Sequence, residues 1–218
     1  MQNTNNETEC ESLHPDDIAK AITEAKASLQ AFIAGKEKTI LSHVAEMKLL
    51  GDIQYPYVCY RVDGQAEPAC KLTSPSDLPA EIRSIYLIDS GLTNVYSTQS
   101  TLVVGVQACV YAHFGKSGTA TVSGMSAMRF DTTRSSTPNS QHNFGRAFDV
   151  KLQGRMKSNG ASYDQLACAY LCAYCVEAGA TKVFFSDQAV VDAVNKATGK
   201  TVCSNIAGHE NHIHMDCR

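Results

Sequence analysis

The stretch Ser140-Gln-His142-Asn-Phe-Gly145-Arg-Ala147-Phe-Asp149 carries the strongest information about the fold of this chain. Gly145 predicts a tight turn soon after His142, because glycine tolerates the backbone angles that such turns need. Asp149 then falls at the start of an expected strand, Phe148–Leu152. The turn and the strand together would return the carboxylate to the neighbourhood of the imidazole.

A second polar segment, Gly208-His209-Glu210-Asn211-His212-Ile213-His214, follows about sixty residues later in a region of short apolar runs. Side chains two residues apart in an extended strand point to the same face of the sheet. We therefore expect His212 and His214 to project together, with Ile213 turned to the opposite side.

Two imidazoles and one carboxylate form a common catalytic zinc set, in which water takes the fourth position. Such a metal lowers the pKa of its bound water towards ~7 and so supplies a nucleophile at neutral pH. The alternative is that these histidines are ordinary surface or hydrogen-bonded core residues, and the spacing alone leaves both interpretations open.

The composition is that of an ordinary globular protein. The 218 residues include 44% hydrophobic and 19% charged residues, and the formal net charge is -3, which does not favour a nucleic-acid partner. There is no apolar run of ~18 residues, so no membrane span is expected. The N-terminus lacks the features of a signal peptide, so the chain either is not secreted by that route or has already lost its signal.

We expect three regions along the chain: a disordered tail over residues 1–12, a helical region over 13–52 and a main domain over 53–218. Pro15 suits the first turn of a helix, and apolar residues then recur at helical spacing up to Gly35. A second amphipathic piece ends at Gly51. These helices either pack against the main domain or serve as a docking element.

The main domain mixes strands and helices without βαβ regularity, which predicts an α+β fold. The expected strands are Tyr57–Val62, Ser84–Ile88, Leu102–Val106, Thr119–Ser123, Phe148–Leu152, Lys182–Phe185 and His212–Asp216. The expected helices are Tyr163–Ala178, which stops at Gly179, and Asp187–Lys196.

Nine cysteines are an odd number, so at least one thiol must be free or bound outside this chain. High cysteine use favours an oxidising compartment and a disulfide, for which Cys59–Cys70 and Cys203–Cys217 have suitable spacing. The alternative is that the cysteines are small buried apolar residues. Cys168, Cys172 and Cys175 share one face of the expected helix, which favours burial there.

The two motifs, Ser-x-His-x-x-Gly-x-Ala-x-Asp and a later His-x-His, resemble those of zinc peptidases that cut bacterial peptidoglycan peptides. These are the D-alanyl-D-alanine carboxypeptidases, penicillin-insensitive murein endopeptidases and L-alanyl-D-glutamate endolysins. The resemblance covers residues 120–217. It implies the Hedgehog/DD-peptidase fold, with an antiparallel sheet and flanking helices, to which this chain adds its N-terminal helical region.

The resemblance implies that His142, Asp149 and His214 bind zinc. His212 would then face the bound water or the oxyanion of the substrate. Relatives commonly place a carboxylate three residues before the last histidine ligand, where this chain has Asn211. The general base would then be Glu210, or His212 or His209 in its place, or the enzyme is impaired.

The resemblance also implies an arginine for the substrate carboxylate, and Arg134 occupies about that place, with Arg129 as the second choice. Ser140 would hydrogen-bond a ligand or the substrate, unless it only shapes the turn with Asn139. The site of action would be periplasmic or extracellular by an unknown export route, and an immunity or delivery partner remains an open possibility.

The expected function is therefore that of a zinc-dependent carboxypeptidase or endopeptidase acting on peptidoglycan. Two alternatives share the same metal site. One is a non-catalytic binding module that zinc stabilises, which Asn211 motivates. The other is a small dipeptidase of the D-Ala-D-Ala type.

Overall fold

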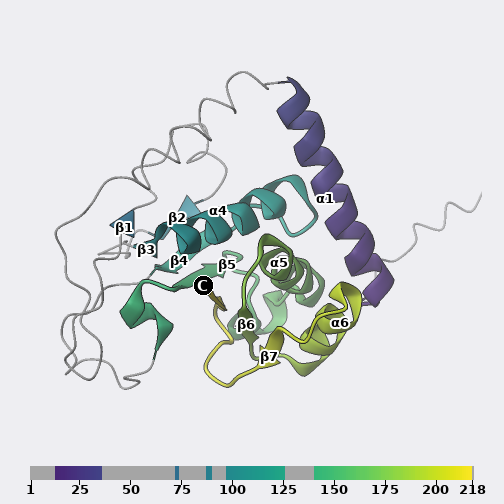
Figure 1. The fold of residues 1–218 in the computed structure, drawn as a ribbon. Coiled ribbons are helices and arrows are strands. Elements are labelled where there is room, and N and C mark those ends of the chain that lie inside the picture. The colour runs from purple at the N-terminus through teal and green to yellow at the C-terminus, as the bar shows by residue number, and fades with distance from the viewer. Residues whose placement is uncertain (1–12, 36–71, 74–86, 90–96, 126–139, 218) are drawn as a thin grey trace, which may run out of the picture.

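The computed structural model describes residues 13–35, 72–73, 87–89, 97–125 and 140–217. Its architecture is α+β, as the sequence predicts. A six-stranded sheet in the order β2-β4-β5-β8-β6-β7 forms the centre, and β1 (Leu72–Thr73) pairs with β3 (Ser97–Thr98) in a separate small sheet (Figure 1). The six strands are β2 (Leu87–Ile88), β4 (Thr121–Met125), β5 (Ala147–Lys151), β8 (Ile213–Asp216), β6 (Lys182–Phe185) and β7 (Cys203–Asn205).

The sheet is mixed rather than purely antiparallel, which corrects the expectation. The four central strands β4, β5, β8 and β6 pair antiparallel. The edge strands β2 and β7 pair parallel with β4 and β6. The parallel edge at β7 follows a helical crossover from β6 through α6 (Gln188–Thr198), which is how parallel neighbours are normally joined.

Three helices cover one face of the central sheet. α4 (Gln99–Phe114) contacts β5, α5 (Gln165–Ala178) contacts β6, and α6 contacts β7. Along β5 and β8 the apolar side chains alternate with polar ones, and Phe148, Val150, Ile213 and Met215 are fully buried. This alternation leaves the other face of the same strands to polar residues.

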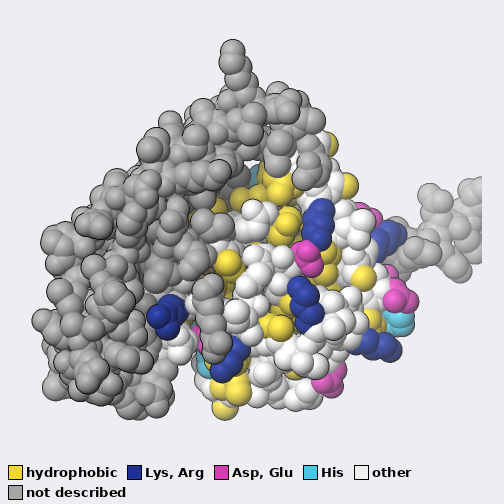
Figure 2. Space-filling view, viewed as in Figure 1, with side chains coloured by type: hydrophobic (Ala, Val, Ile, Leu, Met, Phe, Trp, Pro, Cys, Tyr) yellow, Lys and Arg dark blue, Asp and Glu magenta, His cyan; other side chains and the backbone are white. Residues whose placement is uncertain are grey.

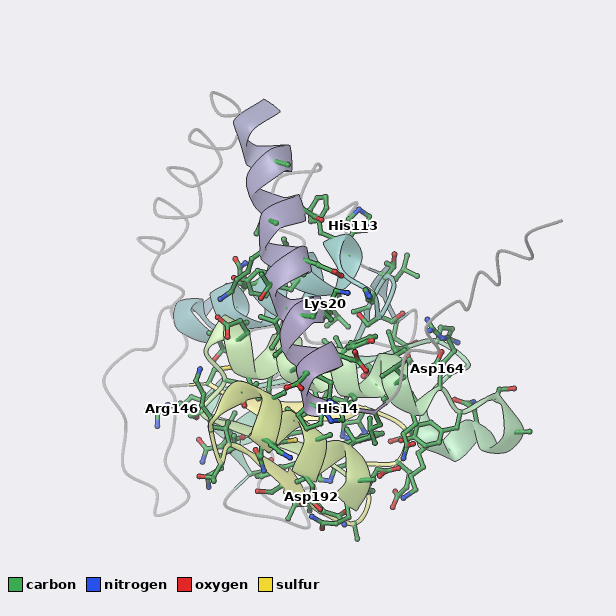
Figure 3. All side chains as sticks on the ribbon, turned by 90° about the vertical axis from the view of Figure 1, so that its right-hand side faces the viewer. His14, Lys20, His113, Arg146, Asp164 and Asp192 are labelled. Carbon is green, nitrogen blue, oxygen red and sulfur yellow. The ribbon has the colours of Figure 1, made fainter. Side chains whose placement is uncertain are left out.

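The N-terminal helix α1 (Pro15–Gly35) packs on the outside of this helical layer. It contacts α4, α5 and α6, and Figure 3 shows it lying across them. Its buried side comprises Ile18, Ala21, Ile22 and Ala25, whose spacing matches one helix face. The packing interpretation of this helix is therefore confirmed for residues 15–35, whereas the expected second helix lies outside the described residues.

Helix α5 forms the core of the domain. Residues 167 to 176 are all buried, so the helix is apolar on every side, as expected for a central helix. The side chain of Asp164 accepts a hydrogen bond from the Ala167 amide at 2.9 Å and begins the helix. Gly179 ends it in the left-handed conformation, with φ 108°, as the sequence predicts.

The described cysteines are free and buried, which corrects the predicted Cys203–Cys217 disulfide. They are Cys109, Cys168, Cys172, Cys175, Cys203 and Cys217. Burial raises the pKa of the Cys109 and Cys217 thiols to about 12, so these groups are uncharged members of the core. The other predicted pair, Cys59–Cys70, lies outside the described residues.

Several boundaries predicted from the sequence agree with the structure. Strand β6 has the predicted bounds, and β5, β8, α5 and α6 differ from the prediction by two residues or fewer at each end. The predicted strand Leu102–Val106 is wrong, because these residues belong to α4. A short apolar run cannot distinguish a buried strand from a buried helix, and here the apolar character continues to Phe114, beyond the length of a strand.

Figure 2 shows the surface from the same side as Figure 1, and on its described part Lys and Arg side chains are interspersed with Asp and Glu. No helix in the described ranges has both the length and the apolar composition that crossing a bilayer requires.

Candidate metal centre

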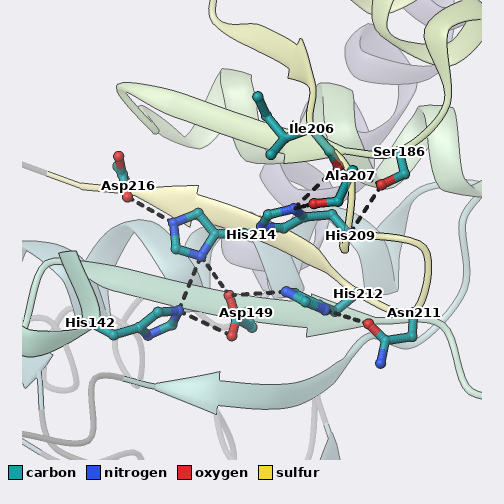
Figure 4. A network of polar contacts seen from close by, with 10 residues as sticks. All are labelled: His142, Asp149, Ser186, Ile206, Ala207, His209, Asn211, His212, His214 and Asp216. Atoms are coloured by element: carbon teal, nitrogen blue, oxygen red, sulfur yellow. Dashed lines mark hydrogen bonds and ion pairs between the residues drawn. The ribbon is translucent and has the colours of Figure 1, made fainter. Parts of the chain in front are cut away.

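Three side chains from two distant segments converge on one point (Figure 4). The Nε2 atom of His142 lies 3.1 Å from Nδ1 of His214 and 3.2 Å from Oδ2 of Asp149. Nδ1 of His214 lies 2.9 Å from Oδ1 of Asp149. The structure thus brings together the three residues that the sequence proposed as metal ligands, and they form a group that could hold a metal ion.

The pairing of the strands explains this convergence. Asp149 of β5 lies opposite His214 of β8, and His214 in turn lies opposite Phe184 of β6. The ring of Phe184 stacks on the His214 ring, with centroids 5.2 Å apart and an interplanar angle of 5°. Two ligands therefore lie in one cross-strand row, on the face of the sheet opposite to Phe148 and Ile213.

The same row continues into β4, where Gly124 lies opposite Asp149. A Cβ atom at Gly124 would lie 2.1 Å from Oδ2 of Asp149, so only glycine leaves space for the carboxylate. The pairing of β4 with β5 shifts between Val122 and Gly124, which is the signature of a β-bulge. This irregularity places a residue without a side chain under the carboxylate.

His142 enters the site from a short 3-10 turn, Gln141–Phe144. Gly145 closes the turn with φ 71°, and its amide reaches the carbonyl oxygens of Gln141 and His142. This is the tight turn that the sequence predicts at Gly145. The chain then runs directly into β5, which carries Asp149.

The charges of the cluster are mutually stabilising. Burial alone would raise the pKa of Asp149, but hydrogen bonds with His142 and His214 hold it well below its ordinary range. Burial alone would lower the pKa of His214, but its hydrogen bonds with Asp149 and Asp216 raise it to about 9. In the metal-free protein the cluster is therefore an ion pair of carboxylate and imidazolium.

His212 lies beside the three candidate ligands, as the alternation of the strand predicts. Its Nε2 atom is 4.0 Å from Oδ1 of Asp149. Its Nδ1 atom is 2.6 Å from Oδ1 of Asn211, so the ring donates its Nδ1–H to that amide oxygen. Burial lowers the pKa of His212, which favours the neutral ring with a lone pair on Nε2.

Glu210 is not one of the three converging residues. Its Oε1 atom accepts from the Gly208 amide at 3.3 Å, and the residue is half-buried. Hydrogen bonds with backbone amides, its own and that of Gly208, lower the pKa of this carboxyl group. His209 contacts the rings of His212 and His214, while its Nδ1 lies 3.3 Å from the Ile206 and Ala207 carbonyl oxygens.

Of the two proposed substrate-binding residues, only Ser140 belongs to the described part of the chain. Ser140 directly precedes the turn that carries His142, and its side chain is half-buried and makes no capping hydrogen bond. Arg134 and the second choice, Arg129, lie outside the described residues.

Three contributors to the site were absent from the sequence interpretation: Asp216, Gly124 and Phe184. Asp216 carried a usable signal, because it follows His214 by two residues and must share its face of β8. Gly124 and Phe184 reach the site only through strand pairing, which the sequence does not specify.

No family model matches this chain, and neither a curated protein nor a solved structure matches it.

Proposed function

We propose that this chain is a zinc-dependent peptidase that hydrolyses amide bonds in peptidoglycan peptides, with a fold of the Hedgehog/DD-peptidase type. The observation that carries the proposal is the meeting of His142 and Asp149 from the first motif with His214 from the second. The resemblance of the motifs supplies the substrate class. A peptidoglycan substrate would place the site of action in the periplasm or outside the cell.

The donor set fits zinc. A tetrahedral zinc ion with ligands at about 2.0–2.1 Å keeps its ligand atoms about 3.3 Å apart. The three separations here, 2.9, 3.1 and 3.2 Å, are close to one face of such a tetrahedron. Two nitrogen atoms and one oxygen atom are the ligands of a catalytic rather than a closed structural site, because a fourth position stays open.

A divalent cation bound here would supply Lewis acidity, which polarises an amide carbonyl and makes water more acidic. The protein residues then have to bind the substrate and move protons. Nε2 of His212 carries a lone pair because Nδ1 donates to Asn211, and it faces Asp149 of the cluster. His212 is therefore better placed than Glu210 to accept a proton from water and return it to the leaving amine.

A specific observation favours a second function, a non-catalytic zinc-stabilised binding module of the same fold. Position 211 holds an amide that cannot exchange protons, and the neighbouring carboxylate of Glu210 contacts the backbone of its own loop. If His212 does not carry protons, the cluster would still bind a cation and join the two motifs.

The deciding experiment combines metal analysis with mass spectrometry of muropeptides after digestion of purified sacculi. We expect one zinc per chain and released peptides for the unaltered protein, and neither for His142→Ala. The matched control is His113→Ala, because His113 is an exposed histidine of α4 outside the cluster.

The outcomes separate the two functions. Protein without zinc and without turnover contradicts both. Zinc at one per chain with no turnover of sacculi, of muropeptides or of D-Ala-D-Ala favours the binding module. Turnover of free D-Ala-D-Ala alone would favour the dipeptidase alternative.

A further inference from the structure

A buried carboxylate stands directly behind the His214 ligand. Oδ1 of Asp216 lies 2.8 Å from Nε2 of His214, on the side of the ring away from the three converging atoms (Figure 4). Both residues are only 7% exposed. A carboxylate can only accept here, so the ring donates its Nε2–H to Asp216.

This hydrogen bond determines which nitrogen of His214 carries the lone pair. A neutral imidazole has one N–H group and one acceptor nitrogen. When the proton is held on Nε2, the acceptor is Nδ1, and Nδ1 is the atom that lies 3.1 Å from Nε2 of His142 and 2.9 Å from Asp149. Once a cation displaces the Nδ1 proton, the ring therefore presents its lone pair to the point where the ligands meet.

The surrounding structure fixes Asp216 in that position. It belongs to β8, which is paired on both sides, so Asp216 lies opposite Ala147 of β5 and Lys182 of β6. Its backbone carbonyl accepts from the amide and the hydroxyl of Thr181, at 2.8 and 3.1 Å. Thr181, just before β6, thus fixes the backbone of Asp216, while the carboxylate of Asp216 contacts His214.

We infer that Asp216 is a positioning residue for the metal centre, which orients His214 and fixes the tautomer that exposes Nδ1 to a divalent cation. The inference rests on the proposed metal site. Carboxylates behind ligand histidines fix the orientation of the ring and increase its basicity as a ligand. His142 has no comparable partner on Nδ1 among the described residues, so the two histidine ligands are held unequally.

The test measures the affinity for Zn²⁺ by chelator competition at one fixed pH, for the unaltered full chain and for D216A and D216N. We expect D216A to weaken Zn²⁺ binding by roughly 10- to 100-fold, the usual effect of removing such a partner. D216N keeps an oxygen acceptor and should restore part of the affinity. The absorption spectrum of the Co²⁺-substituted protein should change in D216A, because the His214 ligand is no longer oriented.

The matched control is D164A, which removes the N-cap of α5 outside the cluster and should lower thermal stability without changing Zn²⁺ affinity. Equal affinity of D216A and the unaltered protein would overturn the inference and leave the proposed function standing. The inference is also overturned if D164A loses as much affinity as D216A, since affinity would then only follow stability. An unaltered protein that binds no Zn²⁺ contradicts the proposed function and this inference together. If D216A does not fold, D216N alone decides by the same affinity and Co²⁺ measurements.

Discussion

Phe148 and Asp149 are consecutive residues of β5, yet they lie in opposite environments. The ring of Phe148 is fully buried and packs so closely on α4 that a Cβ at Gly105 would lie 2.4 Å from it. The carboxylate of Asp149 lies on the other face, over Gly124 and among imidazoles. The comparison shows that one face of the sheet carries the stability of the fold and the other carries the candidate metal centre, so substitutions can separate the two.

The largest effect is expected for Asp149→Ala, which removes the one carboxylate among the three converging side chains. Because loss of an outer partner already costs roughly 10- to 100-fold in affinity, loss of a direct ligand should exceed that range. Chelator competition with Zn²⁺ measures the effect. The neighbouring change Phe148→Ala should instead lower the free energy of unfolding by about 3–5 kcal/mol and leave zinc bound to the folded protein. Unchanged zinc affinity in Asp149→Ala would remove this residue from the site.

The two glycines provide a finer version of the same comparison. Gly124→Ala would push on the Asp149 carboxylate and should weaken Zn²⁺ binding by roughly tenfold or more, as displaced partners of ligands do. Gly105→Ala would push on Phe148 and should cost about 1–3 kcal/mol of stability through overpacking. Chemical denaturation and zinc competition on both variants should show opposite rankings. If both variants affect only stability, the close approach at Gly124 has no role in the metal centre.

The metal affinity should depend on pH because a proton competes for His214. Burial would lower the pKa of this residue, but the hydrogen bonds that its ring donates to Asp149 and Asp216 raise it from 6.5 to about 9 in the metal-free protein. Binding of a cation to Nδ1 must then release a proton, so the apparent Zn²⁺ affinity should rise by up to about tenfold per pH unit until pH 9. Proton release in calorimetry with two buffers measures this directly, and its absence between pH 7 and 9 would contradict the arrangement.

The same pKa shift has the opposite sign for the stability of the metal-free protein. A histidine with a raised pKa in the folded state stabilises the fold fully below pH 6.5, and this contribution is lost as the pH rises through 9. Metal-free protein should therefore lose stability between these values, while zinc-loaded protein should not.

The smallest effect on the metal centre is expected for Asp187→Ala, on the helical side of the molecule. Asp187 accepts hydrogen bonds from the Val190 amide at the start of α6, from Tyr163 and from Gln165. Its loss should lower the free energy of unfolding by roughly 1–2 kcal/mol, as for other N-caps, with unchanged Zn²⁺ affinity. A loss of affinity here would show that the two faces are coupled.

The local shape of each motif could be predicted from its spacing, whereas the choice of His142, Asp149 and His214 as ligands rests on the resemblance of the two motifs to those of zinc peptidases. His142, Gly145 and Asp149 form a turn and a strand within ten residues, and His212 and His214 share a face by simple alternation. Local spacing does not show which residues of the neighbouring strands lie opposite the residues of a motif. Gly124, Phe184 and the short strand β7 became visible only once the strands were paired.

The prediction of a strand within α4 has a similar physical cause. Leu102–Val106 is apolar and rich in valine, and apolar residues on most sides of the helix remove the helical periodicity that would identify it. The predicted Cys203–Cys217 disulfide is wrong because the sequence does not distinguish a buried free cysteine from a cysteine in a disulfide.

Strand β8 comes last among the described strands in the sequence, yet it lies between β5 and β6 in the sheet. During synthesis on the ribosome, β5 and β6 cannot be joined in one sheet until residues 213 to 216, which form β8 between them, have been made. The same residues bring His214 to His142 and Asp149, so the nascent chain cannot assemble the cation site until β8 has been translated. Completion of the sheet and assembly of the candidate cation site are thereby tied to the translation of the same four residues.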